Sequence, residues 1–136
     1  MADFPPEESR AVGARVLLVD ADAAVRAAVA FALEVEGFVV GAYETADALL
    51  ALGAPQDSRC LVLDHRLPGT DGLALLGRLR ASGVRSPAIL LTSNPSRRLR
   101  RRIEDAGARL IEKPLLSHAL AATIRSVAGP FQEPVQ

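Results

Sequence analysis

The sequence predicts an α/β fold in which a parallel β-sheet is covered by helices on both faces. Residues 16–19, 60–63 and 88–91 are continuous apolar runs of strand length. A strand without polar alternation is buried on both faces, as in the parallel sheets of α/β proteins. Amphipathic helical patterns separate these runs, and strands that alternate with helices are typical of a doubly wound domain.

The length and composition of the chain fit one globular domain. It has 136 residues, of which 49% are hydrophobic and 24% charged, close to the averages of globular proteins. Sixteen basic and sixteen acidic residues leave no overall charge that would attract nucleic acid or a membrane. Cys60 is the single cysteine, which excludes a disulfide framework and a cysteine zinc site. The apolar runs are too short to span a bilayer and no leader pattern opens the chain, so we expect a cytoplasmic protein.

The domain is expected to span residues 15–128. Residues 1–14 and 129–136 contain prolines and no apolar period, so we expect a flexible arm and a flexible tail there. Within the domain, residues 38–43 and 109–111 are two weaker strand candidates, which bring the expected number of strands to five.

Five helices are predicted from capping residues and from apolar residues at helical spacing. They run from Asp22 to Gly37, over 45–52, 72–82 and 97–106, and from Ser117 to Val127. Asp22 and Ser117 are suited to cap their helices, and Gly37, Gly83 and Gly107 end three of the five helices. The residues expected to face the sheet are Val25, Val29, Ala32 and Leu33, then Leu73, Leu76 and Leu79, then Leu99, Ile103 and Ala106, and finally Leu120, Thr123, Ile124 and Val127.

Polar side chains follow the predicted strands at their carboxyl ends, where the sites of doubly wound domains lie. Asp20 and Asp22 follow the first strand, Asp64 the third, Thr92 the fourth, and Lys113, the chain's single lysine, the fifth. Carboxylates suit Mg²⁺, whereas a hydroxyl and an ammonium suit phosphoryl oxygens. The sequence therefore predicts a site that holds phosphate and metal.

Four motifs at these strand ends resemble one known family. They are Val-Asp at 19–20, Leu-Asp-His-Arg-Leu-Pro-Gly at 63–69, Leu-Thr-Ser at 91–93 and Glu-Lys-Pro at 112–114. Together, and in this order, they resemble the receiver domain of two-component response regulators, most closely receivers of the nitrogen-fixation regulator type. The resemblance covers residues 15–127 and implies a flavodoxin-like sheet of strand order 2-1-3-4-5 with five helices.

The resemblance also implies a role for each site residue. Asp64 is expected to accept a phosphoryl group from the phosphohistidine of a histidine kinase or phosphotransfer protein. Asp20, Asp64 and the backbone carbonyl of Arg66 are expected to hold Mg²⁺, while Lys113 and Thr92 bind phosphoryl oxygens. The expected function is a stand-alone receiver that signals to a downstream protein partner and is not an enzyme beyond its own phosphorylation and dephosphorylation.

Two positions depart from the family pattern. Ala21 stands where a direct metal ligand is expected, so Mg²⁺ affinity should be weakened. Asp22 is a candidate substitute, although its position favours a helix N-cap. Leu110 stands where the family places an aromatic switch residue. We therefore expect the step that reports phosphorylation to a partner to be atypical.

An arginine run is the most unusual surface feature. Its members, Arg97, Arg98, Arg100, Arg101 and Arg102, spread over the helix face opposite Leu99 and Ile103. They form either a solvated face or a docking face for an acidic partner, and nucleic acid is the least favoured ligand. The resemblance also allows a homodimer through the fourth and fifth helices.

Two other functions stay open. The first is a degenerate receiver that acts as an interaction module without phosphorylation. Metal-dependent phosphorylation would distinguish the phosphoacceptor receiver from this module. The second is a phosphatase of the haloacid dehalogenase type, because Asp20-Ala21-Asp22 mimics its motif. Turnover of a phosphate ester that is lost on Asp20→Asn would identify the phosphatase.

Overall fold

The computed structural model describes residues 15–51, 58–113 and 117–128. The predicted arm and tail, and the last residue of the predicted helix 45–52, lie outside the described residues. The elements are β1 (Arg15–Val19), α2 (Ala23–Val35), β2 (Val39–Tyr43), α3 (Ala46–Leu50), β3 (Cys60–Asp64), β4 (Arg66–Leu67), β5 (Thr70–Asp71), α4 (Gly72–Ala81), β6 (Ala88–Thr92), α5 (Arg97–Asp105), β7 (Arg109–Glu112) and α6 (Ser117–Ala128).

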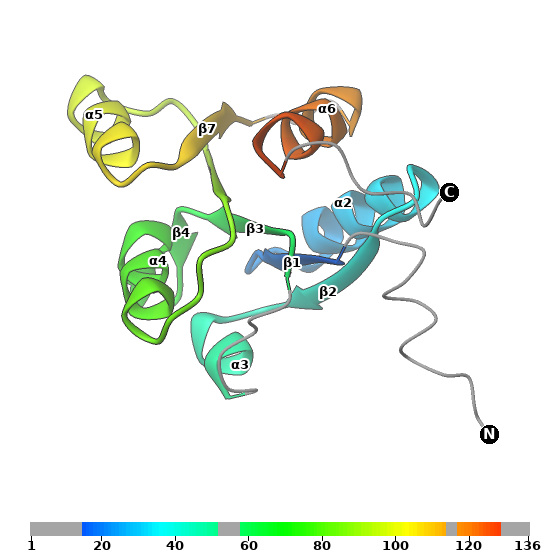
Figure 1. Cartoon of the computed structure of the whole chain (residues 1–136), viewed down its shortest axis with the longest axis horizontal. Coiled ribbons are helices and arrows are strands. Elements are labelled where there is room, and N and C mark those ends of the chain that lie inside the picture. The colour runs from blue at the N-terminus through cyan, green and yellow to red at the C-terminus, as the bar shows by residue number, and fades with distance from the viewer. Residues whose placement is uncertain (1–14, 52–57, 114–116, 129–136) are drawn as a thin grey trace.

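Five of the strands form one parallel sheet in the order β2-β1-β3-β6-β7 (Figure 1). This order confirms the predicted 2-1-3-4-5 arrangement. The chain therefore reverses its direction of growth between β1 and β3, which is the switch point of a doubly wound sheet. At this point the carboxyl ends of two neighbouring strands carry the carboxylates that the sequence places there.

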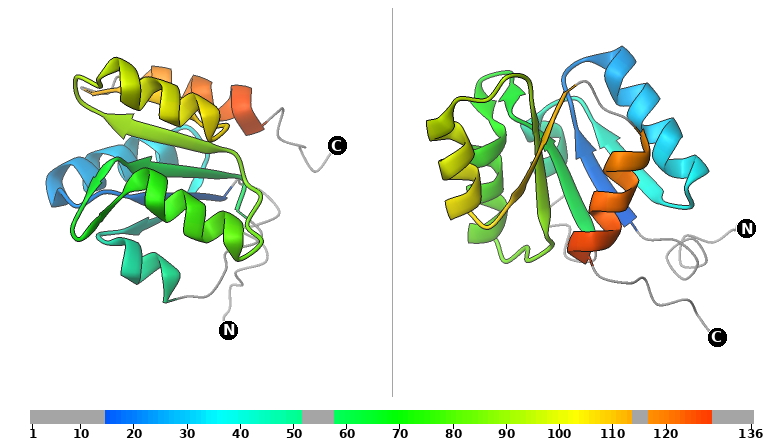
Figure 2. Two further views of the ribbon diagram at one scale, coloured as in Figure 1. Left: turned by 90° about the vertical axis from the view of Figure 1, so that its left-hand side faces the viewer. Right: turned by 90° about the horizontal axis from the view of Figure 1, so that it is seen from above.

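Two hydrophobic cores lie on the two faces of the sheet, because successive strand residues point to opposite faces. Leu61 and Leu63 pack in the core under α3, α4 and α5. Cys60 and Val62 pack in the core under α2 and α6. The two views of Figure 2 show these helices on either side of the sheet. All of β3 and β6 is buried, as the continuous apolar runs predicted.

Side-chain caps and glycines define the helix ends. The Asp22 carboxylate accepts hydrogen bonds from the N–H groups of Ala24 and Val25, so Asp22 is the N-cap of α2. After α2, Gly37 has φ 101°, and after α5, Gly107 has φ 77°. A left-handed backbone is easily adopted by glycine, so both predicted helix ends are confirmed.

The inward face of two helices differs in detail from the prediction. Leu75 is fully buried together with Leu76 and Leu79, whereas Leu73 is half-buried. Ala106 is exposed because α5 ends at Asp105, so Ala106 is the C-cap and turns away from the sheet. None of the helices that the structure describes is long and apolar enough to cross a membrane.

Candidate functional site

Lys113 joins two buried carboxylates at the carboxyl edge of the sheet. Asp20 follows β1 and is 0% exposed, and Asp64 ends β3 and is 7% exposed. The Nζ atom of Lys113 lies 3.4 Å from Oδ2 of Asp20 and 3.3 Å from Oδ2 of Asp64. The structure thus brings together three of the side chains that the sequence predicted for one site.

Backbone hydrogen bonds hold the three residues in place. Oδ1 of Asp20 accepts from the N–H of Asp22 at 2.9 Å. The carboxylate of Asp64 accepts from the N–H of Arg66. The N–H of Lys113 donates to the carbonyl of Thr92 at 2.9 Å, which ties the end of β7 to the end of β6. The site is therefore built on strand ends and short turns, which keep it rigid.

Thr92 lies beside this cluster at the end of the neighbouring strand. It is 5% exposed, and β6 pairs with β3 so that Leu91 is the partner of Asp64. Thr92 also lines a hollow of about 410 Å³ between the loops that follow β3 and β6. The hollow thus lies at the carboxyl edge of the sheet, beside the turn that follows Asp64.

The three residues after β1 have different environments. Asp20 is buried in the site, Ala21 is half-buried, and Asp22 is exposed with its carboxylate engaged as the cap of α2. Within the described residues, no three His, Cys, Asp or Glu side chains are grouped to hold a metal ion. Among the described residues, Asp20 and Asp64 are the carboxylates in ion-pair range of Lys113, while the Asp22 carboxylate caps α2.

This donor set still fits Mg²⁺. Magnesium is commonly bound by one or two carboxylates, with water and phosphate oxygens completing an octahedron. Asp20 and Asp64 supply two carboxylates at one edge of the sheet. The carbonyl oxygen of Arg66, in the adjoining turn, could serve as a third ligand. The residues fit the metal with one carboxylate fewer than the resemblance implies.

Comparisons with known proteins identify the family of this chain. The sequence profile of the response regulator receiver domain matches residues 16–125. The chain belongs to the response regulator receiver domain family. It is 37% identical over 119 residues to the transcriptional regulatory protein FixJ of Azorhizobium caulinodans, covering 87% of this chain and 56% of FixJ. It is 33% identical to FixJ of Bradyrhizobium diazoefficiens, covering 82% of this chain and 55% of that protein. The receiver domain thus spans about half the length of these curated relatives.

Solved structures share the fold of this receiver domain. A CheY-like receiver domain protein from Methanospirillum hungatei matches with a TM-score of 0.78 and 27% sequence identity, over 85% of this chain and 94% of that chain. The flavodoxin-like fold and the assignment to two-component signalling that the sequence predicted are confirmed. Receiver domains of this kind are signalling modules, generally not enzymes.

Sequence reasoning missed two residues that shape the receiver site. Nη1 of Arg26 donates to the backbone carbonyl of Asp20 at 2.8 Å and braces the loop after β1. Gly72 begins α4, and a Cβ atom on it would lie 2.7 Å from the backbone oxygen of Asp64. Neither contact has a local sequence signal, because each joins residues on different elements.

The receiver site raises the pKa of Asp64. Burial is the largest cause, and the nearby charge of Asp20 acts in the same direction, whereas Lys113 opposes both. A carboxyl whose pKa is higher in the folded state favours folding in acid, and this contribution is lost as the pH rises through the raised pKa. Ionised Asp64 therefore weakens the fold at neutral pH.

We expect the Asp64→Asn variant to be more stable than the wild type at neutral pH. The gain should be absent below the ordinary Asp pKa of 3.8 and should grow as the pH rises through the raised pKa of Asp64. Urea denaturation at a pH below 3.8 and at about pH 8 measures the change in the free energy of unfolding. Glu44→Gln, at an exposed position, is the control. An equal effect of Asp64→Asn at both pH values would contradict the prediction.

Proposed function

We propose that this receiver domain accepts a phosphoryl group on Asp64 from a histidine kinase or phosphorelay protein in the cytoplasm and signals through contacts with a downstream protein. One observation carries the proposal: the buried Asp64 carboxylate lies 3.3 Å from the Nζ atom of Lys113 at the carboxyl edge of the sheet. A nucleophile with a cation at hydrogen-bonding range is suited to attack an anionic phosphoryl group.

The transfer forms one bond to phosphorus and breaks another. A carboxylate oxygen of Asp64 forms a bond to the phosphorus of the donor's phosphohistidine, and the P–N bond breaks with its electron pair left on the imidazole nitrogen. The product is an aspartyl phosphate, which carries more negative charge than the carboxylate it replaces. Lys113 faces both Asp20 and Asp64, so its ammonium is placed to pair with a phosphoryl oxygen. The Thr92 hydroxyl is the proposed ligand of another phosphoryl oxygen.

Mg²⁺ is the proposed cofactor, held by Asp20, Asp64 and the carbonyl of Arg66. When bound, it supplies positive charge that offsets the repulsion between the carboxylates and the phosphoryl oxygens. Lys113 alone offsets one of the two negative charges of the buried pair, since Asp20 and Asp64 share a single ammonium. For this reason we expect phosphorylation to require the metal even though its affinity is weakened by Ala21.

Intact mass spectrometry after incubation with acetyl phosphate tests the proposal. We expect one phosphoryl adduct on the wild type with Mg²⁺, no adduct with EDTA, and no adduct on Asp64→Asn. The Asp64→Asn variant keeps the size of the side chain and removes the nucleophile, and circular dichroism checks that it is folded. An adduct on Asp64→Asn would place the acceptor elsewhere and overturn the assignment.

Ala21 and Leu110 favour a second candidate, a receiver that acts as an interaction module without phosphorylation. Ala21 contributes no carboxylate, and Leu110 is a half-buried aliphatic residue of β7. The same measurement separates the two functions. Folded wild-type protein that forms no adduct with Mg²⁺ would support the interaction module and reject phosphoryl transfer.

A further inference from the structure

A closed ring of hydrogen bonds links Asp20, the buried carboxylate after β1, to the first turn of α2. Oδ1 of Asp20 accepts from the N–H of Asp22 at 2.9 Å. The carbonyl of Asp22 accepts from the N–H of Arg26 at 2.8 Å. Nη1 of Arg26 then donates to the carbonyl of Asp20 at 2.8 Å. The half-buried Arg26 side chain therefore closes the ring on the residue where it began.

This ring determines which atom of Asp20 faces the receiver site. The N–H of Asp20 donates to the carbonyl of Tyr43 at 3.1 Å, which ties Asp20 to β2. The carbonyl of Asp20 is bound by Arg26, and Oδ1 is bound by the N–H of Asp22. Oδ2 is the oxygen that lies 3.4 Å from Nζ of Lys113. The hydrogen bonds of Asp20 thus hold its carboxylate with Oδ2 directed into the site.

The charge of Arg26 does not explain its place beside a metal ligand. Among residues 15–51, 58–113 and 117–128, no carboxylate lies in ion-pair range of Arg26, and its partner is a neutral carbonyl. A guanidinium so close to a ligand of Mg²⁺ repels the divalent cation. The charge of Arg26 therefore opposes metal binding, whereas its hydrogen bond can favour it.

Magnesium binding depends strongly on the orientation of its ligands. Mg²⁺ requires a nearly ideal octahedron, and partners that orient its ligands contribute to its affinity. Ala21 supplies no carboxylate, so the proposed metal site has Asp20 and Asp64 as its two acidic ligands. A site with few ligands depends more on the orientation of each of them.

We propose that Arg26 is a positioning residue that tightens Mg²⁺ binding by holding Asp20 through its backbone carbonyl. Arg26 acts through Asp20 and contacts neither the metal nor the phosphoryl group in this role. The inference rests on the metal site of the proposed function and adds a residue of α2 to its support.

Exchange of arginine for methionine at the two ends of α2 tests this role. Arg26→Met removes the guanidinium and keeps an unbranched chain that can pack as the arginine stem does. Arg125→Met is the matched control, because Nη2 of Arg125 donates to the carbonyl of Glu36 at 3.2 Å, at the far end of α2. The affinity for Mg²⁺ is measured from the melting temperature across a titration with MgCl₂, without a phosphoryl donor.

We expect Arg26→Met to weaken Mg²⁺ binding by about tenfold. Arg125→Met should lower the melting temperature without metal but change the Mg²⁺ affinity by less than about twofold. An unchanged affinity in Arg26→Met would leave Arg26 with a role in stability alone and overturn the proposal. Tighter binding would also overturn it, because the charge of Arg26 would then be its dominant effect.

Arg26→Lys tests the hydrogen bond separately from the charge. Lysine restores both a donor and a positive charge, and the charge opposes the metal. Tighter Mg²⁺ binding by Arg26→Lys than by Arg26→Met must therefore come from the bond to the Asp20 carbonyl, and this is the expected result. Equal affinities of the two variants would overturn the proposal.

The titration distinguishes failure of this proposal from failure of phosphoryl transfer. A wild type that forms the phosphoryl adduct, with wild-type Mg²⁺ affinity in Arg26→Met, would reject the role of Arg26 alone. A wild type that forms no adduct, with weakened Mg²⁺ binding in Arg26→Met, would reject phosphoryl transfer alone. A wild type whose melting temperature does not respond to Mg²⁺ would overturn the metal site and the role of Arg26 together.

Discussion

Replacing Gly72 with alanine is expected to destabilise the domain by about 3 kcal/mol, at the upper end of typical overpacking costs. The added Cβ atom would lie 2.5 Å from Cδ1 of Leu90 and 2.7 Å from the backbone oxygen of Asp64. Leu90 is fully buried in a packed core and Asp64 is held in a buried strand, so neither neighbour has room to move. The helix α4 must therefore shift away from the sheet.

The same helix contains a matched control for this substitution. Gly77 is exposed, and a Cβ atom on it would meet nothing within 4 Å. Alanine is favoured over glycine inside a helix, so Gly77→Ala should stabilise the domain by about 0.5 to 1 kcal/mol. Urea denaturation measures both free energies of unfolding. If Gly72→Ala were as stable as the wild type, the close packing of α4 against Asp64 would be refuted.

The opposite signs expected at Gly72 and Gly77 show why part of the fold could not be predicted from the sequence. Both glycines lie in one helix, and their local sequence does not distinguish them. Only the distance to Leu90 and Asp64 does so, and that distance is set by how α4 crosses the sheet. The apolar run 60–63, in contrast, carries its burial in its own composition, because a strand covered on both faces has no polar alternation.

The candidate site was predictable for a geometric reason. Parallel strands end at one edge of the sheet, so residues that follow them must meet there whatever their separation in the chain. This is why Asp20, Asp64 and Lys113 could be assigned to one site from their positions alone. Arg26 could not, because its contact with the Asp20 carbonyl depends on the orientation of α2 over the loop. The two-residue strands β4 and β5 are too short to leave an apolar period.

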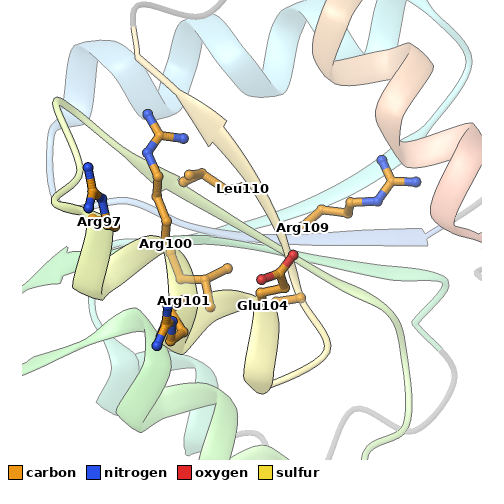
Figure 3. A pocket seen from close by; sticks show the side chains of 8 residues that line it. Arg97, Arg100, Arg101, Glu104, Arg109 and Leu110 are labelled. Carbon is orange, nitrogen blue, oxygen red and sulfur yellow. The ribbon is translucent and has the colours of Figure 1, made fainter.

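The arginine run also shows that the sequence does not predict how a helix is oriented against its neighbours. Its helical period predicted an exposed cationic face on α5, and the five arginines are exposed. The period does not tell which of them border β7, because that depends on the rotation of α5 about its axis. In the structure, Arg97 and Arg101 line a groove between α5 and β7 (Figure 3), whereas Arg98 and Arg102 do not.

Introducing a carboxylate at Ala21 is expected to destabilise the domain without metal and to enlarge its stabilisation by Mg²⁺. Without metal, Ala21→Asp adds a negative charge next to Asp20, in a site where a single ammonium already faces two carboxylates. Like charges at such a site repel, so the variant should unfold at a lower temperature than the wild type and the pKa of Asp64 should rise further. With Mg²⁺, the added carboxylate completes the donor set, and we expect the metal to bind about tenfold more tightly.

Thermal unfolding with and without Mg²⁺ measures both effects, because a ligand that binds the folded state raises the melting temperature according to its affinity. The rise caused by Mg²⁺ should be larger in Ala21→Asp than in the wild type. Ala21→Asn is the control, because asparagine has the size of aspartate without its charge. This variant should keep its stability in EDTA and should gain less stability from Mg²⁺ than Ala21→Asp does. An Ala21→Asp variant that is destabilised in EDTA and gains no more from Mg²⁺ than the wild type would mean that residue 21 does not face the metal. The weakened Mg²⁺ affinity would then have a different cause from Ala21. That cause would be Asp22, whose carboxylate accepts hydrogen bonds from the first turn of α2 and so does not reach the metal.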